Sequence, residues 1–197
     1  MQKPIVIGIT GGIGGGKSTF SSGLREQGQL VFDTDVEAKK LQDEDEYVKA
    51  ELEKLFGNDI YQNGMLERKK IAKIVFADKN MLYKLNQIIH PRVKDRFQKW
   101  VQANKKRKYL FMECAILFEG GFDTYTDKIL VITAPERIRI ERVMKRDEQT
   151  EQQVMARIKN QMPEEEKIKR ATWVIDTHGI KNTAEDVENF LEKIDAY

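Results

Sequence analysis

Residues 11–18 constrain the fold of this chain more than any other segment. They read Gly-Gly-Ile-Gly-Gly-Gly-Lys-Ser and fit the pattern G-x-x-x-x-G-K-[ST], a phosphate-binding P-loop. Glycines let successive backbone N–H groups turn inward around phosphate oxygens. The helix that begins after such a loop points its positive end at the same anion. Lys17 adds a mobile positive charge for the outer phosphates, and the Ser18 hydroxyl is placed to hold Mg²⁺.

The flanking sequence has the context that a P-loop requires. Residues 4–10 form a nearly continuous apolar run, which is typical of a buried parallel strand. Phe20 and Leu24 then repeat at helical spacing, and Gly28 fits the end of that helix. The alternative interpretation is a glycine-rich turn with a surface lysine, but such a turn does not require Lys-Ser at the helix start.

Length and composition limit the other classes of protein. A chain of 197 residues predicts one main domain with room for a lobe. Charged residues make up 34% of it, yet the net charge is only +2, so nothing demands a nucleic acid or an anionic membrane as partner. The single Cys114 cannot form an internal disulfide, and we find neither a membrane-spanning run nor a signal pattern. We therefore expect a cytoplasmic protein.

Alternating strand and helix patterns predict an α/β fold. The predicted strands are residues 4–10, 30–33, 109–113, 128–133 and 173–176. Helical patterns separate these strands, which indicates a parallel sheet with its active site beyond the carboxyl ends of the strands. Polar residues stand at those ends. They are the P-loop residues, Asp33 with Asp35, Glu113 and Asp176.

A helical insertion separates the second and third predicted strands. The gap is about 75 residues, far more than a crossover needs. Helical patterns cover residues 47–56, 71–75 and 78–100, and Pro91 must break or kink the last of them. An inserted lobe beside a P-loop core favours a binding platform for a second substrate.

A second helical section, residues 135–171, follows the fourth predicted strand. Arg139, Arg142 and Arg146 share one helix face because their spacings are three and four. One interpretation is that these arginines lie on a solvent-exposed helix face and pair with Glu136 and Glu141. The other is a clamp for the charge on a transferred phosphoryl group. The Asn-Lys-x-Asp element of GTPases is missing, because Asn104 is followed by Lys-Lys-Arg. A small-molecule kinase with an arginine-bearing lid fits this order of parts.

Several short motifs then occur in a fixed order along the whole chain. They are Gly8–Thr19, Asp33-Thr34-Asp35, His90-Pro91-Arg92-Val93, Ile116-Leu117-Phe118-Glu119, Arg142-Val143-x-x-Arg146-Asp147, Arg157-Ile158-x-x-Gln161 and Val174-Ile175-Asp176. With this order and length, the chain resembles the dephospho-CoA kinase family. The resemblance implies an α/β P-loop kinase three-layer fold with a five-stranded parallel sheet. It also implies one domain, residues 1–197, divided into a nucleotide core (about 1–34, 108–134 and 172–197), a helical substrate lobe (about 35–107) and a helical lid (about 135–171).

The resemblance also implies a reaction. The family transfers the γ-phosphoryl group of ATP to the ribose 3′-hydroxyl of dephospho-CoA, the last step of coenzyme A synthesis. The expected partners are therefore ATP and dephospho-CoA, with Mg²⁺ held at Ser18; the oligomeric state stays open. The expected ATP-binding residues are Gly12, Ile13, Gly14, Gly15, Gly16, Lys17, Ser18 and Thr19.

Residue roles carry over by matching motifs. Asp35, the second aspartate of the D-x-D element, is the expected catalytic base, and Lys17, Arg142 and Arg146 are expected to stabilise the transferring group. Alternatively, Asp35 caps a helix and Asp33 holds the hydroxyl or a metal-bound water. The expected substrate-binding residues are Asp33, His90, Pro91, Arg92, Lys94, Phe118 and Glu119.

Simpler roles exist for some of these side chains. His90 could instead be a packed residue that caps a broken helix. Phe118 could serve core packing, and Glu119 could be a surface carboxylate. The chain also departs from the family pattern: Gly15 replaces a common Ser, Thr34 an Ala, Ala115-Ile116 an element with Pro, and Thr177 an Asn. Another metabolite kinase and a nucleotide-binding regulator without transfer activity are the competing functions.

Overall fold

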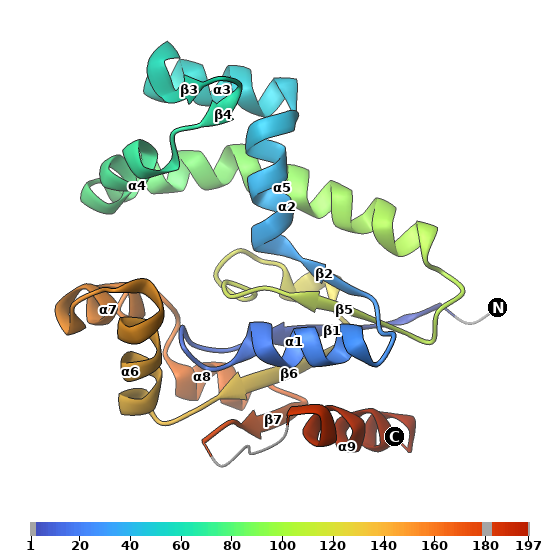
Figure 1. Ribbon diagram of the computed structural model, residues 1–197. Helices are drawn as coiled ribbons and strands as arrows, with labels where there is room; N and C mark the ends of the chain where they lie inside the picture. The colour runs from blue at the N-terminus through green and yellow to red at the C-terminus, as the bar shows by residue number, and fades with distance from the viewer. Residues whose placement is uncertain (1–2, 179–182, 197) are drawn as a thin grey trace. The chain divides into compact units, whose positions relative to one another are not determined.

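A five-stranded parallel sheet forms the core of the computed structural model, which describes residues 3–178 and 183–196 (Figure 1). The strand order is β2-β5-β1-β6-β7. The strands are β1 (Ile5–Thr10), β2 (Val31–Asp33), β5 (Tyr109–Glu113), β6 (Lys128–Thr133) and β7 (Trp173–Asp176). All five predicted strands are confirmed, each within one residue of its expected bounds, and so is the predicted α/β class.

The central strand β1 is buried because it has a partner on each side. Its register pairs Ile9 with Glu113 of β5 and Thr10 with Val131 of β6. Ile7 and Ile9 are completely buried. The order of the strands reverses direction beside β1, and ligands of parallel sheets bind beyond the carboxyl ends at such a point. The P-loop follows β1 at this edge.

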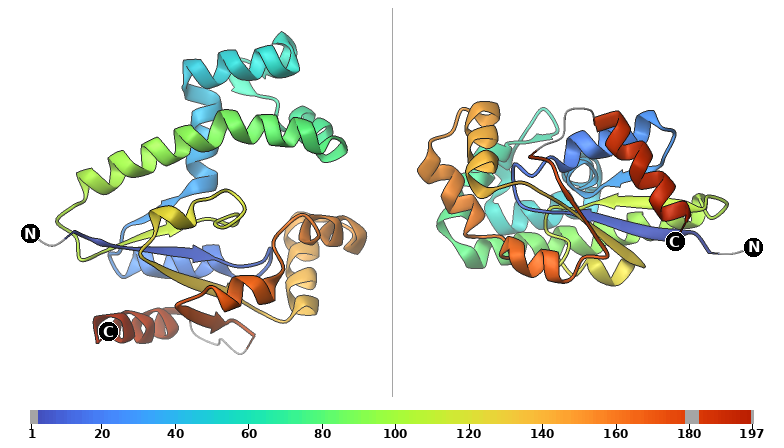
Figure 2. Two further views of the ribbon diagram at one scale, coloured as in Figure 1. Left: turned by 180° about the vertical axis from the view of Figure 1, so that it is seen from behind. Right: turned by 90° about the horizontal axis from the view of Figure 1, so that it is seen from below.

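Two helices cover one face of the sheet. They are α1 (Lys17–Glu26) and α9 (Thr183–Asp195), whereas α8 (Glu164–Lys169) lies on the opposite face (Figure 2). The ring of Phe190 makes edge-to-face contacts with Phe20 and Trp173, with centroids 5.7 and 5.6 Å apart. Aromatic contacts of this kind add to the burial of apolar area, so they fix both helices against the sheet.

The chain divides into two compact units. One consists of Met1–Phe32 with Asn104–Tyr197 and contains the sheet core, and the other consists of Asp33–Ala103. The elements of the second unit are α2 (Thr34–Glu44), α3 (Glu46–Phe56), the 3₁₀ helix η1 (Asn58–Ile60), the hairpin β3 (Tyr61–Gln62) and β4 (Met65–Leu66), α4 (Arg68–Ala77) and α5 (Lys79–Ala103). The first unit also contains η2 (Asp123–Tyr125), α6 (Glu136–Asp147) and α7 (Glu151–Ile158).

Helix α5 continues through Pro91, so of the predicted break or kink the break is wrong. Proline removes one backbone hydrogen bond from a helix interior. Buried side chains nevertheless recur every four positions from Leu85 to Phe97, on both sides of Pro91. The burial of this continuous apolar stripe offsets the lost bond. His90 therefore lies inside a helix and does not cap one.

The sequence analysis did not predict the small hairpin of the second unit. Asn63 and Gly64 form its two-residue turn, with φ of 51° and 78°. Two consecutive positive φ values define a type I′ turn, for which Asn-Gly is the favoured pair. Within the described parts of the chain, no helix has the length and apolar character needed to cross a lipid bilayer.

Gly11 is the residue whose replacement we expect to damage the first unit most sharply. Its φ is 145°, and an added Cβ would lie 2.0 Å from the backbone oxygen of Ile132. We expect Gly11→Ala to lower the free energy of unfolding by about 3 kcal/mol, because strain and overlap combine. The matched control is Gly28→Ala, since Gly28 has a φ of 74° with no atom within 4 Å of such a Cβ.

The control should cost about 1 kcal/mol, the strain of a left-handed backbone alone. Urea unfolding of both variants, followed by circular dichroism, measures the difference. Equal losses in the two variants would contradict the close packing of Gly11 against β6.

Candidate functional site

The P-loop lies between β1 and α1 and depends on glycine for its shape. Gly14 and Gly16 have φ of 79° and 97°, values that side chains other than glycine rarely adopt. Gly16 is the N-cap of α1, and the Lys17 ammonium donates to the carbonyl oxygens of Gly11 and Gly12 at 2.9 and 3.2 Å. The loop therefore presents backbone amides at a helix N-terminus, with a lysine folded across it, which is an arrangement suited to phosphate.

The loop lies directly against the β6–α6 connection. A Cβ at Gly12 would come within 2.0 Å of Arg139 Nη1, and one at Gly15 would come within 2.6 Å of the Ile132 backbone oxygen. Gly15 stands where the family pattern described above commonly has Ser. Glycine there allows the loop to approach β6 more closely than a side chain would.

Three of the arginines of α6, Arg139, Arg142 and Arg146, lie in different surroundings. Arg139 is 5% exposed; its Nε donates to the Ala134 carbonyl oxygen at 3.0 Å, and its Nη1 is 3.7 Å from Glu164 Oε2. Arg146 pairs with Asp147 through two hydrogen bonds of 2.6 and 3.0 Å. The hydrogen bond from Arg146 is the main cause that holds the pKa of Asp147 well below its usual range.

Arg142 is joined to the loop after β7. Its Nη1 donates to Thr177 Oγ1 at 2.7 Å, and its Nη2 donates to the Thr177 carbonyl oxygen at 3.1 Å. The Thr177 hydroxyl lies 3.0 Å from the Gly15 carbonyl oxygen and 3.1 Å from that of Thr133. A single threonine thus connects α6, the P-loop and the end of β6.

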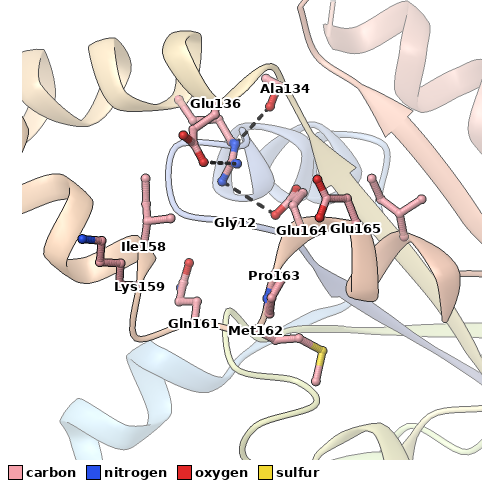
Figure 3. Close-up of a pocket in the computed structure, with 12 residues that line it drawn as sticks. Gly12, Ala134, Glu136, Ile158, Lys159, Gln161, Met162, Pro163, Glu164 and Glu165 are labelled. Atoms are coloured by element: carbon pink, nitrogen blue, oxygen red, sulfur yellow. Dashed lines mark hydrogen bonds and ion pairs between the residues drawn. The ribbon is translucent and has the colours of Figure 1, made fainter.

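A pocket of about 470 Å³ opens beside the P-loop and Arg139 (Figure 3). Its walls come from the P-loop, from the start of α6 and from the segment that joins α7 to α8. They include Gly12, Glu136, Arg139, Gln161 and Glu164. The Arg139 guanidinium contacts the Ala134 carbonyl oxygen, Glu136 and Glu164, the last two at 4.0 and 3.7 Å.

Phe118 and Glu119 follow β5 and contact the α7–α8 region. Glu119 Oε1 accepts a hydrogen bond from the Met162 backbone N–H at 2.7 Å and lies 3.3 Å from the Lys167 ammonium. Lys167 is completely buried. The Arg170 guanidinium lies 5.2 Å from the centre of the Phe118 ring. Phe118 and Glu119, both predicted to bind substrate, therefore anchor the segment that runs from Met162 to Arg170.

The structure assigns the helix cap of the D-x-D element to Asp33. Its Oδ1 accepts hydrogen bonds from the backbone N–H groups of Asp35 and Val36, both at 3.0 Å. The alternative in which Asp35 is the N-cap is therefore wrong. Asp35 lies in the exposed first turn of α2, where a carboxylate is favoured by the helix dipole.

The predicted residues of the second unit lie in the middle of α5. They are His90, Pro91, Arg92 and Lys94. The Arg92 guanidinium lies 4.2 Å from the centre of the Tyr47 ring. Burial, together with the positive charge of Lys94, lowers the pKa of His90 from 6.5 to about 4. His90 is therefore neutral at pH 7.

His90 should make stability depend on pH. Between pH 6.5 and 4 the unfolded chain binds a proton at this site that the native chain does not, so His90 lowers the free energy of unfolding as the pH falls. We expect the wild type to lose stability relative to His90→Gln through this window, with the difference levelling below pH 4. Urea unfolding of both proteins between pH 7 and 4 measures it. A difference that stays constant across the window would contradict the burial of a neutral imidazole.

Three residues at the P-loop were not among the predicted site residues. They are Arg139, Gln161 and Thr177. The spacing of the arginines places Arg139 on the same helix face as Arg142, and Gln161 belongs to one of the quoted motifs. Neither pattern predicts which residues Arg139 and Gln161 contact. Gln161 Oε1 accepts a hydrogen bond from the Ile13 backbone N–H at 3.1 Å.

Ser18 is the P-loop residue that would hold a magnesium ion arriving with a nucleotide. The Ser18 hydroxyl stands at the second position of α1, directly after Lys17. Among the residues that the structure describes, no group of three His, Cys, Asp or Glu could hold a metal ion. Mg²⁺ commonly keeps several waters and binds through substrate phosphates, so it does not need such a cage.

The family model and the most similar relatives point to the same family. A family model described as dephospho-CoA kinase matches residues 5–182. A dephospho-CoA kinase from Bacteroides fragilis is 41% identical over 177 residues, which is 90% of this chain and 86% of that relative. A crystal structure of a Thermus thermophilus protein is 37% identical, covers 99% of this chain and 98% of that one, and has a TM-score of 0.83. A dephospho-CoA kinase structure from Campylobacter jejuni is 26% identical, with 96% of each chain covered and a TM-score of 0.71.

Proposed function

Because the chain belongs to the dephospho-CoA kinase family, we propose that it transfers the γ-phosphoryl group of ATP to the ribose 3′-hydroxyl of dephospho-CoA. The products are coenzyme A and ADP. The observation that carries this proposal is the family match over residues 5–182, which includes the P-loop and the whole of the unit Asp33–Ala103. We also propose a cytoplasmic location, because the single cysteine cannot form an internal disulfide.

We assign the role of general base to Asp35. A ribose hydroxyl is a poor nucleophile at neutral pH, and a carboxylate within hydrogen-bond reach can orient it and accept its proton. Asp33 supports this assignment, because Oδ1 of its carboxylate already caps α2, which leaves only Oδ2 for the substrate. Dephospho-CoA is then held by the remaining expected residues: Asp33, His90, Pro91, Arg92, Lys94, Phe118 and Glu119.

The P-loop and α6 stabilise the transferring group in this proposal. Residues 12–19 line the phosphates with backbone amides, except that the Ile13 N–H donates to Gln161, and the Lys17 ammonium binds the phosphates as well. Arg142 and Arg146 neutralise charge on the phosphoryl group. The Ser18 hydroxyl fits Mg²⁺, which when bound supplies charge neutralisation at the β- and γ-phosphates. Closure of the lid segment excludes water that would otherwise compete with the ribose as acceptor.

The reaction is tested with a panel of acceptors. Wild-type protein with ATP and Mg²⁺ should release ADP rapidly with dephospho-CoA, and not with adenosine, cytidine, shikimate or pantothenate. Mass spectrometry should show a product heavier by one phosphoryl group. Turnover with another acceptor would overturn the substrate assignment, and nucleotide binding without any transfer would favour a regulator.

Asp35→Asn tests the general base. We expect kcat to fall by about 10²- to 10⁴-fold, because the amide cannot accept the proton, while dephospho-CoA still binds. Asp45→Asn is the matched control, since Asp45 caps the next helix, α3, through its 3.0 Å hydrogen bond from the Val48 N–H. Calorimetric titration measures substrate binding, and ADP release measures kcat. An Asp35→Asn protein with normal turnover would contradict the assignment of Asp35 as general base.

Arg142→Ala tests the charge on α6. Its removal should lower kcat by about 100-fold and change the KM for dephospho-CoA much less, because the proposed contact strengthens as charge develops in the transition state. Arg137→Ala is the control on the same helix, because the Arg137 side chain is 90% exposed and pairs only with Glu141 among the described residues. The reverse pattern, a raised KM with normal kcat, would count against the role of Arg142.

A further inference from the structure

The segment between α7 and α8 places a side-chain amide on the P-loop. The Ile13 backbone N–H donates to Gln161 Oε1 at 3.1 Å. A backbone N–H can only donate, so the carbonyl oxygen of Gln161 is the atom that faces the loop. This contact places the Gln161 side-chain amide at the loop. Because Nε2 is bonded to the same carbon as Oε1, its two N–H groups lie close to the loop as well.

The Nε2 group lies beside a pocket in which phosphate oxygens would need hydrogen-bond donors. Gln161 lines the same pocket as Gly12 and Arg139, and Figure 3 shows its side chain extending toward Gly12. Within residues 3–178 and 183–196, Nε2 has no hydrogen-bond partner. An amide donor of this kind can bind an anion without any change of protonation state.

The position of Lys17 identifies which phosphate lies nearest. The lysine of a P-loop reaches the β- and γ-phosphates. Its ammonium lies 2.9 and 3.2 Å from the carbonyl oxygens of Gly11 and Gly12. The outer-phosphate end of the loop is therefore at Gly11–Gly12, and Ile13 is the next residue along the chain. The side-chain amide of Gln161 is therefore hydrogen-bonded to the outer-phosphate end of the loop.

Two further contacts hold the residues on either side of the hydrogen bond between Gln161 and Ile13. The next residue, Met162, donates its backbone N–H to Glu119 at 2.7 Å, and Glu119 pairs with the buried Lys167. On the other side, the Ile13 side chain packs against a small apolar cluster of α6 and α7, which consists of Ile140, Val143 and Val154. A side chain fixed in this way loses little entropy when it binds a ligand, so it is preorganised for binding.

We propose that Gln161 contacts the γ-phosphate of ATP: Oε1 holds the Ile13 N–H, and Nε2 donates to a γ-phosphate oxygen. The contact exists with ATP and is lost with ADP, so Gln161 distinguishes the two nucleotides. As charge shifts during transfer, the donor also stabilises the transferring group. This inference rests on the proposed function only in taking ATP as the phosphoryl donor.

Gln161→Glu separates this role from a purely structural brace. Glutamate keeps an oxygen for the Ile13 N–H but replaces the two N–H donors with a negative oxygen. We expect affinity for the β,γ-imido analogue of ATP to fall at least about tenfold, while affinity for ADP changes less than about twofold. We also expect kcat to fall by about 100-fold. Gln152→Glu on exposed α7 is the control, because it adds the same charge to the same segment.

Gln161→Met completes the comparison, because it has a similar length and neither hydrogen-bonding group. If Gln161 only braces the loop, the methionine variant loses thermal stability and activity while the glutamate variant keeps the wild-type ratio of analogue to ADP affinity. That result would overturn the proposal. Titration calorimetry measures both affinities without an acceptor, and thermal unfolding shows whether each variant is folded.

The same measurements keep the two proposals apart. A wild type that binds both nucleotides but does not phosphorylate dephospho-CoA would overturn the proposed function, and the ratio of affinities in Gln161→Glu would still decide the role of Gln161. A wild type that forms coenzyme A, together with an unchanged ratio in Gln161→Glu, would overturn only the inference about Gln161.

Discussion

The close packing of the P-loop against the end of β6 is the constraint on which the candidate site depends. Gly11 and Gly15 have no room for a side chain, because the Ile132 backbone occupies that space, and Gly12 lies against the Arg139 guanidinium. Interiors of proteins are packed as densely as organic crystals, so such a contact fixes both partners. The loop amides, the start of α6 and the loop after β7 are therefore positioned together around one phosphate-binding cradle.

Helix α6 shows how surroundings give similar side chains different roles. Arg139 is buried at the back of the P-loop, Arg142 is tied to Thr177, and Arg146 is exposed beside Asp147. A buried charge requires partners, whereas an exposed ion pair contributes little to stability. Arg139 therefore supports the loop itself, whereas Arg142 and Arg146 are exposed and bonded to Thr177 and Asp147.

Two local features of the second unit mark the limits of reading a sequence by pattern. Pro91 predicts a break, but α5 continues because its apolar stripe is buried on both sides of the proline. The free-energy cost of one lost hydrogen bond is smaller than the gain from burying that stripe. The burial of the stripe is seen only in the tertiary structure. The hairpin at Asn63-Gly64 was missed although its signal is local. The pair that favours a type I′ turn stands in the sequence, between strands of only two residues each.

The sequence by itself determined the five core strands, the α/β class, the P-loop and the family. These follow from hydrophobic runs, glycine spacing and the order of short motifs, all of which are local. Only the tertiary structure decided that Asp33 rather than Asp35 caps α2, that Thr177 joins Arg142 to the loop, and that Gln161 reaches Ile13. The last contact joins residues 148 positions apart. No local pattern encodes such a pairing, because it depends on where the packed sheet and helices bring distant backbone groups together.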